Sequence, residues 1–153
     1  MSIKAIDDLI RVSGAHFSYC EPELKEKLHN IAEEFLKVLA ASEGLTSVSI
    51  RRNPGGIAVS GEVTLLSDLC YVQVSQAAFQ QTRGGLQVLI RGVRHLEDYE
   101  GLHNLWVNLT AGLDPERALQ EITDKVAAAE SASKKFQESR KSCQNSNHHR
   151  STK

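Results

Sequence analysis

Titratable side chains of the kind that catalyse reactions gather in one short stretch of the chain, between Gly84 and Leu109. His95 and His103 lie on either side of Asp98, and a histidine oriented by a carboxylate can act as a general base. Two arginines lie close by, Arg91 and Arg94. Their guanidinium groups would hold an anionic substrate. Catalysis centred on the two histidines and Asp98 is therefore one hypothesis for this chain.

Motifs that would strengthen this hypothesis are absent from the sequence. There is no GxSxG turn for a nucleophilic serine, no HExxH, no CxxC pair and no glycine-rich phosphate loop. Cys20, Cys70 and Cys143 are scattered, and His148 and His149 stand next to each other in a polar tail. We therefore predict that the protein holds no metal and no cofactor, and that it binds a partner rather than catalyses a reaction.

The bulk properties are typical of a globular protein. The 153 residues carry a formal net charge of −1, with 41% hydrophobic and 24% charged residues, which suits one domain. No apolar run approaches the roughly 20 residues of a membrane span, and the first residues lack the apolar core of a signal peptide. We expect a soluble cytoplasmic protein that does not contact membranes.

Charge is distributed unevenly along the chain. From Lys134 to Lys153 six lysines and arginines stand against a single acid, Glu138, whereas the rest of the chain is net acidic. Apolar residues also thin out towards this end. We therefore predict one α+β domain over residues 1–138 and a disordered basic tail over residues 139–153.

Apolar spacing and end signals predict three main helices. Helical spacing from Ile3 to Ile10 indicates a short first helix that ends at Gly14. A longer apolar stripe over residues 22–44 indicates a second helix. The last helix begins clearly, because Asp114 is a good cap and Pro115 fits the first helical position.

Between the second and the last helix the apolar period changes to two, which predicts strands. Strands are expected at residues 47–51, 57–65, 69–75, 86–93 and 102–109, with a short helix or a loop at residues 76–83. Asn53-Pro54-Gly55-Gly56 forms the first turn. The fold class predicted is α+β, an antiparallel five-strand meander with two N-terminal helices and one C-terminal helix packed on one face.

The other face of this sheet would carry polar and aromatic side chains. Six residues on this face or in the connector beside it form the predicted binding surface: Arg51, Tyr71, Arg91, Arg94, Tyr99 and Trp106. Trp, Tyr and Arg are the usual energetic anchors of protein interfaces. The sequence leaves open whether Trp106 is exposed on this face or buried under the first helix.

These patterns favour a small non-enzymatic binding or adaptor module, homo-oligomeric, that uses the uncovered sheet face to contact itself or another protein. The first alternative is a single-stranded nucleic-acid-binding protein, in which the open face stacks bases and the basic tail attracts phosphates. The second alternative is a small-molecule enzyme centred on His95, Asp98 and His103.

Overall fold

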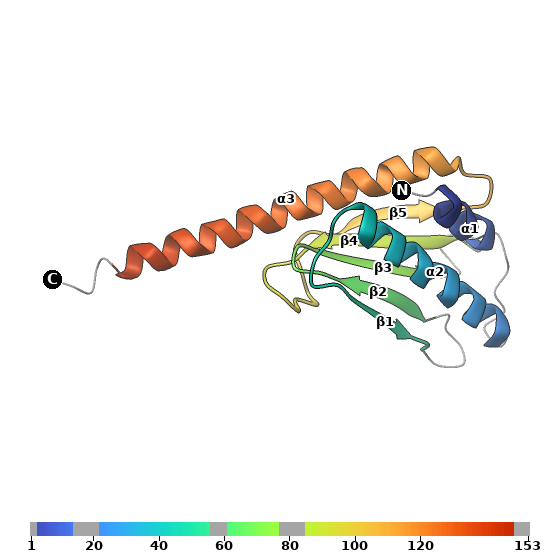
Figure 1. Cartoon of the computed structure of the whole chain (residues 1–153), viewed down its shortest axis with the longest axis horizontal. Coiled ribbons are helices and arrows are strands. Elements are labelled where there is room, and N and C mark those ends of the chain that lie inside the picture. Colours follow the sequence, from blue (N-terminus) through green and yellow to red (C-terminus); the bar gives the residue numbers. More distant parts are fainter. Residues whose placement is uncertain (1–2, 14–21, 56–60, 77–84, 149–153) are drawn as a thin grey trace.

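The computed structural model describes residues 3–13, 22–55, 61–76 and 85–148, and within these residues it has the predicted α+β architecture (Figure 1). The helices are α1 (Ile3–Ser13), α2 (Pro22–Ser42) and α3 (Pro115–His148). The strands are β1 (Ser49–Asn53), β2 (Glu62–Leu66), β3 (Cys70–Gln76), β4 (Leu86–Gly92) and β5 (Leu105–Leu109). Each strand pairs antiparallel with the next in the order β1-β2-β3-β4-β5. The predicted meander is confirmed.

The inner face of the sheet is the side on which the helices pack. One cross-strand row on this face contains Leu65, Val72 and Ile90, and all three side chains are fully buried. They share one core with α2, whose Phe35 is the largest fully buried side chain, and with α1 and α3. Because strand residues alternate between faces, the neighbouring residues point to the other side.

The helix α3 is fixed to the body as far as Gln137 and then leaves it. Ser133 of α3 is buried. Its hydroxyl donates to the Leu69 carbonyl oxygen before β3 and accepts from the Val93 amide after β4, so it joins three segments of the chain. The side-chain amide of Gln137 donates to the Asp68 carbonyl oxygen (3.2 Å). From residue 138 to residue 146 every side chain is exposed, and the helix runs past the end of the sheet (Figure 1).

Residues 139–148, for which the sequence predicts a disordered tail, are helical in this structure and continue α3; residues 149–153 lie outside the described residues. The physical reason is that the packed part of α3, up to Gln137, supplies the nucleus, after which each added residue gains a hydrogen bond. The polar composition of this segment, taken by itself, predicts disorder.

Several predicted boundaries shift. Gly14, residues 57–60 and residues 77–83 lie outside the described residues, so the predictions made for them stay untested. The strand β5 begins at Leu105 rather than at residue 102, because the amide of Leu102 donates to the Gly92 carbonyl oxygen (2.9 Å) and closes the preceding segment. We call residues 93–104 the connector. It joins β4 to β5.

Candidate contact surface on the uncovered sheet face

The outer face of the sheet is the side away from the helices, and three cross-strand rows define it. The central row runs through Arg51, Thr64, Gln73, Leu89 and Trp106. A second row contains Asn53, Glu62, Ser75, Gln87 and Asn108, and a third contains Ser49, Leu66, Tyr71 and Arg91. Side-chain amides and hydroxyls dominate these rows. The outer positions of these rows are polar, whereas Leu66, Tyr71 and Leu89 are buried and form a small cluster with Val93 of the connector. No described helix packs on this face (Figure 1).

Trp106 lies at the β5 end of the central row with 45% of its surface exposed. Burial under α1 is thus ruled out. Its backbone is held from the helix side, since the ammonium group of Lys125 on α3 donates to the Trp106 carbonyl oxygen (2.6 Å). This bond satisfies an acceptor on the edge strand and discourages strand-to-strand association there. The indole itself stays available for contact.

Tyr71 and Arg91 face each other across β3 and β4 and cover one another. The Arg91 guanidinium lies 4.0 Å from the centroid of the Tyr71 ring, a favourable cation–π geometry. Tyr71 is only 6% exposed and its hydroxyl donates to Gln73 (2.7 Å). Burial raises the pKa of Tyr71. Both residues are thus part of the face, but Tyr71 offers little free ring surface.

Tyr99 of the connector folds over the β1 side of the face. Its carbonyl oxygen accepts from the Arg91 guanidinium, and its ring lies 5.5 Å from the guanidinium carbon of Arg51. Tyr99 is 46% exposed. Tyr99 and Arg51, together with Glu62 and Tyr71, border a shallow cleft of about 220 Å³. Tyr99 and Trp106 are therefore the accessible aromatic side chains of this surface within the described residues.

The connector is organised around the carboxylate of Asp98, which is 2% exposed. Both of its oxygens accept from the Arg94 guanidinium at 2.8 and 2.9 Å. Oδ1 also accepts from the amides of Glu100 and Gly101, and Oδ2 from the amide of Arg94. The bonds with Arg94 hold the pKa of Asp98 well below its usual range and raise the pKa of Arg94. A glycine is needed at position 101, where φ is +68° and a Cβ would lie 2.7 Å from Arg91.

The catalytic arrangement considered from the sequence does not form. The Asp98 carboxylate is bonded to Arg94 and to backbone amides, and neither histidine is among these partners. His95 and His103 are both exposed, and His95 contacts the carbonyl oxygen of Leu96. Arg94, predicted as a contact residue, points into the connector rather than onto the face. Asp98 is thus a residue that fixes the shape of the connector.

Metal-ligating side chains do not converge either. Within the described part of the chain no group of three or more His, Cys, Asp or Glu residues is placed to hold an ion. Cys70 is buried and Cys143 is exposed on α3, far apart in the fold. Among the described helices, none combines the length and apolar character that crossing a bilayer requires.

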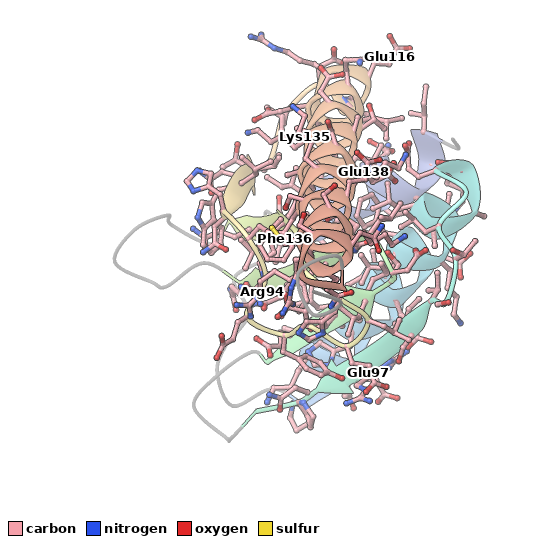
Figure 2. All side chains as sticks on the ribbon, turned by 90° about the vertical axis from the view of Figure 1, so that its left-hand side faces the viewer. Arg94, Glu97, Glu116, Lys135, Phe136 and Glu138 are labelled. Atoms are coloured by element: carbon pink, nitrogen blue, oxygen red, sulfur yellow. The ribbon has the colours of Figure 1, made fainter. Side chains whose placement is uncertain are left out.

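A second hollow, which the sequence did not reveal, lies between α3 and the connector. Six of its lining residues are Leu102, His103 and Leu105 on one side and Ala128, Ala132 and Phe136 on α3. This α3 groove is mostly apolar and measures about 640 Å³. Figure 2 looks along α3 from its projecting end, with Lys135, Phe136 and Glu138 labelled on the helix. The alanines of α3 are visible in the sequence as small side chains, but only the fold shows that Leu102 and Leu105 lie opposite them.

Comparison with known proteins places no further constraint on this site. No protein-family model, no curated protein and no solved structure is significantly similar to the chain. The described residues define an α+β protein with one sheet face covered by helices and one on which no described helix packs. Arguments about function therefore rest on the geometry of the chain itself.

Proposed function

We propose that the protein is a small non-enzymatic binding module, and that the outer face of its sheet contacts a protein partner. The observation that supports this most strongly is the exposure of Trp106 at one end of the central row, with Tyr99 and Arg51 at the other. Large amphipathic side chains at the two ends of a mainly polar face are typical interface anchors. The amide-rich rows between them supply hydrogen-bond donors and acceptors.

The alternative of a single-stranded nucleic-acid binder is less well supported by the same face. Arg91 already stacks on Tyr71, so that ring is not free to stack a base. The charged side chains of the three rows are Arg51, Arg91 and Glu62, which sum to a net charge of only +1. Proteins that hold single strands usually combine several free aromatic rings with a strongly positive groove.

The experiment that tests the proposal is site-specific photo-crosslinking in cells. A photoreactive amino acid is placed at Gln87 and, separately, at Asn108, two outer-face positions, with the same group at exposed Asn30 on α2 as the matched control. The proposal expects protein adducts from both outer-face positions, weakened by Trp106→Ala, and few from Asn30. Equal yields from all three positions would contradict it.

The chemical nature of the adduct separates the alternatives. An adduct of twice the chain mass identifies a second copy as the partner, and a heavier or lighter protein adduct identifies a different protein. Adducts that disappear with nuclease would contradict a protein partner. In that case titration with single-stranded oligonucleotides should quench the fluorescence of Trp106, the single tryptophan of the chain, with steep salt dependence.

A further inference from the structure

The α3 groove has the shape and chemistry to accept a helix. Its α3 wall contains Ala128, Ala129 and Ala132, whose small side chains allow another backbone to approach closely, followed by Lys135 and Phe136. Leu102 and Leu105 form the opposite wall. No described residue fills the space between the two walls. An apolar groove of about 640 Å³ along a helix is a suitable seat for a second helix.

The projecting end of α3 continues the line of this groove. Ser139, Cys143 and Ser146 follow Ala132 and Phe136 at spacings of three and four, so they lie on the same side of the helix. Residues 138–146 are all exposed. Isolated helices shorter than about 12 residues are marginal in water. A segment of this kind gains stability when another element packs along it.

Charge along α3 shows which element fits. Residues 115–130 carry four acids against two bases, a net charge of −2: Glu116, Glu121, Asp124 and Glu130 against Arg117 and Lys125. Residues 131–148 carry four bases against one acid, a net charge of +3: Lys134, Lys135, Arg140 and Lys141 against Glu138. The helix therefore has an acidic first half and a basic second half. Its electrostatic complement is the same helix in the opposite direction.

We propose that the α3 groove binds the α3 helix of a second copy of this chain, in antiparallel orientation. This arrangement sets the basic half of each helix beside the acidic half of the other, whereas a parallel pair would set like charges together. Because the contact is isologous, each α3 is both the occupant of one groove and the wall of the other. The projecting end then packs on the partner instead of standing in solvent.

This dimer is independent of the proposed function. The α3 groove lies beside the helix-covered side of the molecule, and the outer sheet face remains open in the pair. Variants of the groove should therefore change the oligomeric state without changing adducts from Gln87 and Asn108 that form with a different protein. Variants of Trp106 should weaken those adducts without changing the oligomeric state that the groove sets.

The direct test is sedimentation equilibrium of the full chain carrying Ala132→Glu, with Ala127→Glu as the matched control. Both alanines are exposed and lie five residues apart on α3, but Ala127 is on the side away from the groove. Burying an unpaired carboxylate in the contact should raise the dimer dissociation constant about tenfold or more, and the control should leave it unchanged. Equal effects of the two substitutions would overturn the proposed seat.

A charge exchange tests the pairing of the two halves. The variant Glu121→Lys with Asp124→Lys makes both halves basic, and the variant Lys135→Glu with Arg140→Glu makes both halves acidic. Each variant alone should dimerise more weakly than the original chain at low salt, and an equimolar mixture should recover dimers. Failure of the mixture to recover them would contradict the electrostatic argument.

The orientation is tested by oxidation of the native Cys143, which is exposed near the far end of α3. In an antiparallel pair the two Cys143 thiols lie near opposite ends, so a Cys143–Cys143 disulfide within the dimer is not expected. Efficient formation of that disulfide, identified by peptide mass, would show a parallel pair and overturn the proposal. So would a monomer at concentrations up to about 1 mM in low salt, where even a weak dimer forms.

Discussion

The guanidinium of Arg91 lies over the ring of Tyr71, 4.0 Å from its centroid, and this stacking divides the aromatic side chains of the outer face into two kinds. Tyr71 is covered and contributes to the packing of the face. Tyr99 and Trp106 are each nearly half exposed. The same arginine binds the carbonyl oxygen of Tyr99 and so holds the connector against the sheet. The contact surface is thus formed by the strands of the sheet and by the connector, which Arg91 of β4 holds in place.

Trp106 and Val107 are adjacent in β5, but truncation to alanine should change the free energy of unfolding by different amounts at the two positions. Trp106→Ala removes an exposed anchor, so we expect the free energy of unfolding to change by less than about 1 kcal/mol. Val107→Ala removes a fully buried side chain and should cost about 2 kcal/mol. Urea unfolding of both variants measures the difference. A larger loss for Trp106→Ala than for Val107→Ala would mean that the indole supports the fold rather than a contact.

Asp98 should contribute to stability in a pH-dependent way. Its pKa is lower in the folded protein than in the unfolded chain, so its contribution is complete above the unfolded value of about 3.9 and is lost as pH falls through the folded value. Asp98→Asn should lower the free energy of unfolding by about 2–4 kcal/mol at pH 7, because hydrogen bonds to a buried carboxylate disappear.

The measurement is urea unfolding of the original chain and of Asp98→Asn between pH 3 and pH 7. The difference in free energy of unfolding between the two proteins should be constant near pH 7 and should become smaller below about pH 4. Glu138→Gln, at an exposed position on α3, serves as the control and should show no such difference. A difference that is independent of pH would argue that the side-chain shape, and not the charge, of Asp98 matters.

Gly92 allows α3 to lie close to β4. A Cβ at this position would come within 2.7 Å of the Ser133 hydroxyl and within 2.8 Å of the Ala129 carbonyl oxygen. Gly92→Ala should therefore displace the helix and lower the free energy of unfolding by about 1–3 kcal/mol. Ser133→Ala should lower it by a similar amount, since the buried Val93 amide loses its acceptor. Exposed Ser131→Ala on the same helix should have little effect.

The two described cysteines should differ in reactivity. Burial raises the pKa of Cys70 to about 12, so its reactive thiolate is scarce and inaccessible in the folded protein. Cys143 is exposed on α3. In a Cys20→Ser background, a thiol reagent at pH 8 should modify Cys143 rapidly and Cys70 only after denaturant is added. Rapid modification of Cys70 in native buffer would show that α3 opens from the sheet.

Much of the fold follows from the sequence because period-two alternation fixes which side of a strand each residue faces. Val88 and Ile90 on the inside and Arg51 on the outside could be assigned in this way. The role of Asp98 could not, because the sequence of a polar connector does not show which carboxylate turns inward to meet Arg94. That choice depends on the backbone amides that the turn at Gly101 presents.

The candidate surfaces also have features that the sequence predicts and features that it does not. The outer-face residues Arg51, Tyr71 and Arg91 were predictable from alternation, but the cover that Arg91 places over Tyr71 was not. The α3 groove depends on the distance between Ala128 and Leu102, which are far apart in the sequence and meet only in the fold. The length of α3 beyond residue 138 depends on a packed nucleus and not on its own polar composition.

The most direct test of the central claim, that the outer sheet face is the contact surface, is the yield of protein adducts from a photoreactive group at Asn108 compared with that at Asn30. We predict an adduct from Asn108 that falls about tenfold or more with Trp106→Ala, as loss of an interface anchor implies, and little adduct from Asn30. Comparable adducts from both positions, or an Asn108 adduct that is indifferent to Trp106→Ala, would contradict the account.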